Sequence, residues 1–240
     1  MMLLDAKALN HKSLNEALRD AGDEIRLENV LGQRFIAAGM SGMKLDIYGT
    51  PGNALGAYLN GAEINVHGNA QDAVGDTMNS GRITVYGSIG DAPGYAMRGG
   101  RIYVKGNAGY RAGIHMKAYR EHLPVMIIGG RAGSFLGEYQ AGGIIIVLGL
   151  NDDGKDIVAN FPCTGMHGGR MYLRSKCEGI HFPHQVTPKP ASKEDMDEIS
   201  DYLSEFCGLF GFDTDEILNA DFTVITPSSK NPYQQMYVAN

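Results

Sequence analysis

Two aspartates are the first residues in this sequence whose spacing suggests chemistry. Asp72 and Asp91 are 19 residues apart, the same interval at which glycines recur around them. If the chain stacks in register at that interval, the two carboxylates could hold a cation or act as acid and base on a polysaccharide. The interpretation that we prefer is that these turn residues cap backbone amides at corners. The next rung carries Tyr110, which limits the acidic ladder to two residues.

Cysteine and histidine offer two further candidate sites. Cys163 and His167, in CTGMHGG, could form a nucleophile and its base. A buried thiol near a turn histidine is the interpretation that we prefer. His181 and His184 have HxxH spacing, but a zinc site needs two or three more ligands, and the sequence places none beside them. We therefore predict no catalytic residue and no metal site.

The composition indicates a folded protein. Among 240 residues, 43% are hydrophobic and 20% charged, which is enough apolar surface for a core. The net charge of −6 argues against nucleic acid and acidic membranes as partners. No apolar run has membrane-spanning length and the start lacks a signal-like pattern, so we expect a cytoplasmic protein. We expect ordinary thiols, neither disulfides nor cluster ligands, at the three widely spaced cysteines: Cys163, Cys177 and Cys207.

A 19-residue repeat must position all of these residues. Glycines and β-branched residues keep this step at several columns, among them Gly49, Gly68, Gly87 and Gly106; Gly56, Gly75, Gly94 and Gly113; and Ile47, Val66, Val85 and Val104. Each unit reads as a short strand followed by glycine-rich turns, with no room for a helix. Stacked strands of this kind indicate a β-solenoid. We predict an all-β, single-stranded, right-handed parallel β-helix of about seven turns.

One step of the repeat is longer than the others. The columns at 104, 106 and 113 continue at Ile128, Gly130 and Gly137, a step of 24. The five extra residues fall within 114–124, which we expect to bulge from the stack. Glu63, Arg82 and Arg101 share another column, and they predict a ladder of surface charges with little effect on stability.

The flanks of the repeat carry helix signals, and they divide the chain into three regions. We expect an N-terminal helical cap at 1–22, with a capping box from Ser13 to Glu16. The β-helix spans 23–180, and 181–240 forms a Pro-rich linker (181–191) and a tail. In the tail we predict a helix beginning at Ser192 and ending at Gly208, a short helix at 214–219 and a strand at 222–226. The long helix has the apolar stripe Met196, Ile199, Leu203 and Phe206.

Five segments together resemble the GXGXG domain of glutamate synthase: 49–61, 68–87, 94–119, 129–150 and 164–174. The resemblance is greatest to free-standing versions of this domain, in which the large subunit is split into separate chains. It extends over about 25–237 and includes the tail FTVITPSSKNPYQQMY. A subunit of formylmethanofuran dehydrogenase that shares the repeat is a more distant likeness.

The resemblance implies a scaffold rather than an enzyme. In the family, a glutaminase domain frees ammonia with an N-terminal cysteine, and another domain holds FMN and an iron–sulfur cluster. The present chain begins Met1-Met2-Leu3 and has no barrel-like pattern for FMN, so we expect both activities on partner chains. We therefore expect a non-catalytic subunit of a glutamate synthase complex, in glutamate biosynthesis, with no cofactor of its own. Self-association is a further expectation.

Two other functions stay open at this stage. The same scaffold could serve a related amidotransferase or a formylmethanofuran dehydrogenase-type complex. A carbohydrate-active solenoid enzyme would use Asp72 and Asp91. The bulge at 114–124 and the tail beyond 190 are the docking elements that we predict, because both break the repeat.

Overall fold

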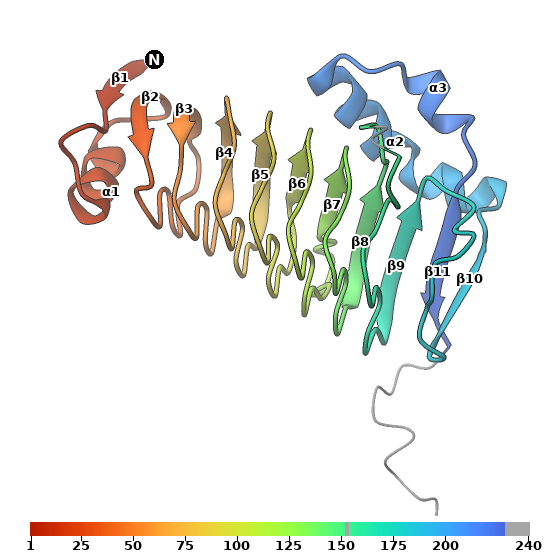
Figure 1. Cartoon of the computed structure of the whole chain (residues 1–240). Helices are drawn as coiled ribbons and strands as arrows, with labels where there is room; N and C mark the ends of the chain where they lie inside the picture. The colour runs from red at the N-terminus through yellow and green to blue at the C-terminus, as the bar shows by residue number, and fades with distance from the viewer. Residues whose placement is uncertain (152–153, 229–240) are drawn as a thin grey trace, which may run out of the picture.

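The computed structural model describes residues 1–151 and 154–228, and in these the strands form one continuous sheet. Each strand from β1 to β8 pairs in parallel with the next, and from β2 onward this is what the repeat predicts (Figure 1). About seven turns separate β2 from β9, and the β-solenoid prediction is confirmed. In spatial order the strands are β1 (Met2–Asp5), β2 (Glu24–Leu31), β3 (Lys44–Thr50), β4 (Asn60–Val66), β5 (Ser80–Val85), β6 (Arg101–Val104), β7 (Val125–Ile128), β8 (Ala141–Val147), β9 (Gly168–Leu173), β11 (Thr223–Pro227) and β10 (Val186–Pro190).

Two columns of aliphatic side chains fill the interior behind this sheet. Ile64, Ile83 and Ile102 stack in register on β4, β5 and β6, and all three are fully buried. On the opposite side of the interior, the backbone of successive turns is joined by isolated parallel β-bridges, such as that between Ala70 and Ile89. Burial of these aliphatic columns is the main stabilising term of the solenoid.

Glycine is required where the turns come back toward the interior. Gly75 and its equivalents have left-handed backbone angles, with φ +67° at Gly75. A Cβ there would lie 2.5 Å from Cδ1 of Ile102, so a side chain would be both strained and crowded. This explains why glycine recurs at this column of the 19-residue repeat.

The longer step of the repeat is also confirmed. Arg101 on β6 pairs with Val125 on β7, which is the predicted interval of 24. Part of the extra chain forms a small loop closed by an antiparallel bridge between Tyr119 and His122. The strands on both sides of the loop keep their register, so the insertion leaves the stack intact.

The N-terminal end differs in detail from the prediction. Helix α1 (His11–Asp20) is capped by Asn10, whose side chain accepts from the backbone N–H groups of Lys12 and Ser13. The predicted capping box from Ser13 to Glu16 is therefore wrong, because an earlier residue takes the orphan amides of the first turn. Leu14 and Leu18 on α1 are buried against the first turn of the solenoid. Strand β1, which precedes the helix, was not predicted.

The C-terminal end closes the sheet with two antiparallel strands. β11 pairs with β9, and β10 then pairs with β11 at the outside. The segment predicted as a Pro-rich linker therefore contains a strand, because its residues pair with the strand predicted at 222–226. Residues 229–237 of the tail lie outside the described residues.

Two helices accompany these last strands. Helix α2 (Lys193–Phe210) has Ser192 as its N-cap, where the start of a helix was predicted. The Ser192 hydroxyl and Asp195 form a reciprocal capping box. It ends at Gly211, with φ +75°, and not at Gly208 as expected. Helix α3 (Thr214–Leu218) follows. None of the helices within the described part of the chain combines the length and apolar character needed to cross a bilayer.

Candidate partner-binding face

The aspartate ladder is part of the corner structure. The Asp72 carboxylate accepts from the backbone N–H of Asp91 at 2.9 Å, and the Asp91 carboxylate accepts from that of Tyr110 at 2.8 Å. Each carboxylate thus satisfies an amide of the following turn, which is the capping role that we preferred. Asn69, Ser88 and Asn107 form a parallel ladder of the same kind.

The cysteine and histidine candidates do not converge. Cys163 is fully buried, burial raises the pKa of its thiol, and its Sγ lies 3.5 Å from the sulfur of Met171. His167 is hydrogen-bonded through Nδ1 to the carbonyl of Gly165, so no thiol–imidazole pair forms. His181 and His184 are exposed. Among residues 1–151 and 154–228, no three His, Cys, Asp or Glu side chains gather as a metal site would require.

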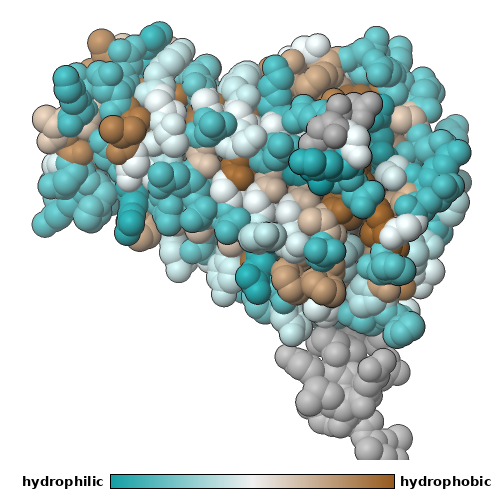
Figure 2. All heavy atoms as spheres, in the orientation of Figure 1, coloured by the Kyte–Doolittle hydropathy of each residue, from teal (hydrophilic) through white to brown (hydrophobic). Residues whose placement is uncertain are grey.

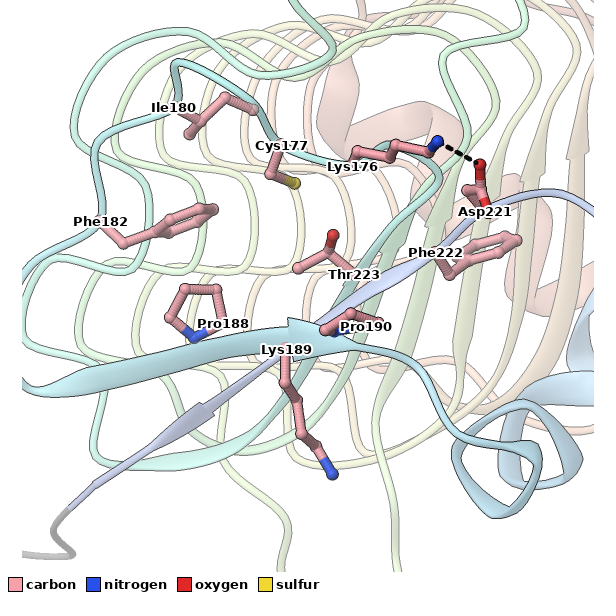
Figure 3. Close-up of a pocket in the computed structure, with 10 residues that line it drawn as sticks. All are labelled: Lys176, Cys177, Ile180, Phe182, Pro188, Lys189, Pro190, Asp221, Phe222 and Thr223. Atoms are coloured by element: carbon pink, nitrogen blue, oxygen red, sulfur yellow. Dashed lines mark ion pairs between the residues drawn. The ribbon is translucent and has the colours of Figure 1, made fainter.

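A pocket of about 420 Å³ opens beside β10 and β11, and Figure 3 shows its walls. Ile180, Phe182 and Phe222 make much of the lining apolar, and Lys176 forms an ion pair with Asp221 at 3.4 Å. Cys177 also lines it, and burial raises the pKa of that thiol, which makes it a poor nucleophile. The apolar part of the lining suits an apolar group.

The outward side of the main sheet changes character along the solenoid. The outward positions are apolar on β7 and β8, whereas on β3, β4 and β5 they are polar. The apolar set is Val125, Ile127, Ile144 and Ile146, and the polar set is Lys44, Asp46, Glu63, Asn65, Arg82 and Thr84. None of the outward residues on β7 and β8 was predicted to be functional, although the change is visible in the runs VMII and GIIIVL.

Helix α2 covers the apolar half of this outward side. Ile199, Leu203 and Phe206 of α2 belong to one buried cluster with Ile127 and Ile146 of the sheet. Figure 1 shows α2 at this end of the sheet. The cluster is separate from the core inside the solenoid. We call strands β7 and β8, which lie under α2, the covered half, and strands β2 to β5 the open half. The tail that was predicted to be a docking element is therefore packed on the chain's own sheet.

An ion cluster marks the border between the two halves. Glu205 of α2 accepts from Arg82 at 2.7 Å and from the Tyr103 hydroxyl at 2.8 Å, and it also pairs with Arg101. Burial opposes ionisation of Glu205, but these hydrogen bonds and the nearby positive charge outweigh it and lower the pKa of its carboxyl. Arg82 also contacts Glu63 at 3.1 Å. The predicted charge ladder is present, and Glu205 of the tail links two of its members, Arg82 and Arg101.

The open half carries a stack of rings on its surface. Tyr48 lies on β3, and His67 and Tyr86 directly follow β4 and β5. The ring centroids are 4.3 and 5.2 Å apart and the ring planes are nearly parallel. Arg26 lies over the first ring, and the His67 Nε2 is 2.9 Å from the Asp46 carboxylate. At the other end of the stack, Tyr86 meets the edge of Phe210 from α2.

These rings form a preorganised surface beside α2. The outline of the molecule dips between the N-terminal end and the α2 region, where hydrophilic and neutral residues prevail (Figure 2). Aromatic and arginine side chains that are held in place lose little entropy on binding, which is why protein interfaces are enriched in them. Fixed rings and an arginine are features that suit the open half to contact with a protein surface.

Comparisons with known proteins agree with this architecture. The family model described as the GXGXG motif matches residues 7–228. An uncharacterized protein of Methanocaldococcus jannaschii is 44% identical over 250 residues, covering 98% of this chain and 96% of that protein. A chain in the structure of the formyltransferase/hydrolase complex from Methylorubrum extorquens, bound to methylofuran, superposes with a TM-score of 0.64. It is 17% identical, and the match covers 92% of this chain and 89% of that one, so it bears on the fold alone.

Proposed function

Because this chain belongs to the GXGXG motif family, we propose that it is a non-catalytic scaffold subunit of a glutamate synthase complex. The observation that carries the proposal is the match of the family model to 7–228, nearly the whole chain. The chain then holds a glutaminase chain and an FMN/iron–sulfur synthase chain in fixed relation, in the synthesis of glutamate. It binds neither cofactor itself.

The geometry supports a scaffold in two ways. Asp72, Asp91 and Cys163, the residues best suited to chemistry, are hydrogen-bonded at corners or buried in the core. The parallel ladder from β1 to β9 makes a stiff element whose two ends and open half are separate surfaces. We propose that one partner chain contacts the stack of Tyr48, His67 and Tyr86.

A second candidate function keeps the scaffold and changes the complex. The solved structure with a similar fold contains a formyltransferase/hydrolase complex, which favours a scaffold in a formyl-transferring assembly as the alternative. The two candidates differ in their partner chains. In the first a glutaminase and a flavin/iron–sulfur protein are present, and in the second a formyltransferase and a hydrolase are.

The test is to isolate the tagged full-length chain from its native cells and identify the proteins that accompany it. Recovery of a glutaminase chain and a yellow-brown flavin/iron–sulfur chain supports the first candidate. Omitting the scaffold from the reconstituted complex should then abolish glutamate formation from glutamine and 2-oxoglutarate, while glutaminase activity of its own chain persists. Recovery of formyltransferase chains would replace the first candidate by the second. Flavin absorbance in the isolated scaffold chain would contradict the proposal.

A further inference from the structure

The two edges of the main sheet present different backbone groups. β1 lies at one edge and β10 at the other (Figure 1). A free edge strand offers its outward N–H and C=O groups to any other strand, and most proteins block such edges. A comparison of the outward groups at the two edges shows which of them can accept a further strand.

The β10 edge is blocked. Ala191 donates to the carbonyl of Phe222 at 2.9 Å, so the odd-numbered residues of β10 face β11 and the even-numbered residues face outward. Of these outward residues, Pro188 and Pro190 have no N–H. The N–H of Val186 is taken by the carbonyl of the residue three positions earlier, at 3.2 Å. No outward donor is left along Val186–Pro190.

The β1 edge is open. Ala6 donates to the carbonyl of Glu28 at 2.9 Å, so the even-numbered residues of β1 face β2. Leu3 and Asp5 therefore direct their N–H and C=O groups away from the sheet. No proline interrupts Met2–Asp5, and the Leu3 side chain is 63% exposed.

The outward groups of β1 are self-complementary about Leu3, so the same strand of a second copy can satisfy them. We propose that β1 pairs antiparallel with β1 of a second copy, with the two-fold axis passing beside Leu3. In that register the two copies of Leu3 exchange both of their hydrogen bonds, and Asp5 of each copy faces Met1 of the other. At the centre of the pairing, the side chains that meet are apolar: Leu3 with Leu3 on one side and Met2 with Leu4 on the other. At each end, the Asp5 side chain meets Met1 of the other copy.

The blocked edge at β10 makes this assembly a closed dimer. Head-to-tail growth would have to pair β1 of one copy with β10 of the next, and β10 has no donors to offer along its edge. The first turn adds further exposed apolar surface at the same end of the solenoid, including Leu31, which is 85% exposed, and Phe35. The result is one sheet running through both copies, with α2 at each far end.

The experiment is to measure the mass of the full chain in solution as a function of concentration. Wild type should approach twice the 25.9 kDa chain mass. The variant Leu3→Pro removes an outward donor from each copy and leaves the bonds to β2 in place, so dimer affinity should fall roughly 30-fold. Leu3→Val keeps the N–H donor and an apolar side chain that favours strands, and it should still dimerise. Circular dichroism and thermal melting establish that both variants fold.

Three results would overturn the proposal. The first is a wild type that stays at the chain mass at all concentrations, and the second is a Leu3→Pro variant that dimerises as wild type does. The third is that Leu3→Pro stops the binding of a different protein at this edge and leaves self-association unchanged. If Leu3→Pro does not fold, spin labels at Leu3→Cys and Leu31→Cys in a Cys177→Ser background replace it. Dipolar broadening should be stronger at position 3, and equal or stronger broadening at position 31 would place the dimer contact elsewhere.

Discussion

The covered and open halves of the main sheet share one interior and differ only on the outside. Ile83 and Ile145 belong to the same inward column and are both fully buried. On the outward side, Asn65 and Ile146 occupy one column, yet the first lies on the open half and the second lies beneath α2. The inward columns therefore determine that the chain forms a solenoid. The outward columns determine which part of it the chain covers with its own helix.

The strongest test of this comparison uses two positions of one outward column. Ile146→Ala should lower the free energy of unfolding by about 3 kcal/mol, because it leaves a cavity under α2. Asn65→Ala should lower it by about 1 kcal/mol or less, since it removes one hydrogen bond to Asp46. Denaturant unfolding of both variants measures the two values. Equal losses would contradict the division into halves.

Substitution of either of two glycines should lower the free energy of unfolding by the same amount in both halves, because both glycines face the shared interior. Gly75 lies in the open half and Gly137 in the covered half, with φ +67° and +65°. Alanine at either position meets the end of a buried side chain and takes a left-handed backbone, so each variant should lose about 1–2 kcal/mol. Thermal unfolding compares them directly. A much larger loss at one position would mean that the halves also differ inside.

At the border, the pH dependence of stability should report on Glu205. Its pKa in the folded chain lies below the ordinary 4.5, so its stabilising contribution is complete above about pH 4.5. That contribution disappears as the pH falls through the lowered pKa. Glu205→Gln should cost about 1 kcal/mol at pH 7 and flatten the acid limb of the stability curve. The control Glu63→Gln, at a more exposed carboxylate that also contacts Arg82, should cost less than about 0.5 kcal/mol at pH 7.

The smallest expected effect on stability belongs to the ring stack of the open half. His67→Ala should change the free energy of unfolding by less than about 1 kcal/mol, because the ring is partly exposed and its contact with Asp46 is near the surface. Capture of the partner chain should nevertheless weaken. Gln71→Ala, at an exposed residue on another side of the same turn, is the matched control. Undiminished capture by His67→Ala would remove the open half from the proposed interface.

Most of the solenoid could be predicted because its signal is periodic. The step from Val85 to Val104, and the longer one to Ile128, set the register of the strands without knowledge of the rest of the fold. Ser192 and Asp195 likewise form a local cap whose chemistry is complete within four residues. Such features depend on neighbouring residues or on a repeated unit.

The parts that could not be predicted depend on pairing between distant residues. β1 has four residues and is a strand only because β2 lies beside it, and β10 is a strand despite its prolines because β11 supplies its partner. Glu205 gathers two arginines more than a hundred positions away. Corner caps at Asp72 and Asp91 were one of two interpretations until the amide contacts were known. The outward apolar residues of β7 and β8 could have been identified in the sequence, because both strands are continuous apolar runs. The 19-residue repeat, however, identifies the inward columns and not the outward ones.

The five-residue insertion at 114–124 shows that a turn can lengthen outward while the strands on both sides keep their register. The separation of the two ends of the molecule therefore depends on how many turns are stacked and is independent of how long each turn is. It changes only in steps of one strand spacing, about 4.8 Å. A protein built in this way can hold two partners only at certain fixed separations. Relatives that gain or lose a whole turn would hold their partners one strand spacing farther apart or closer together. Loop insertions would leave the distance between the partners unchanged.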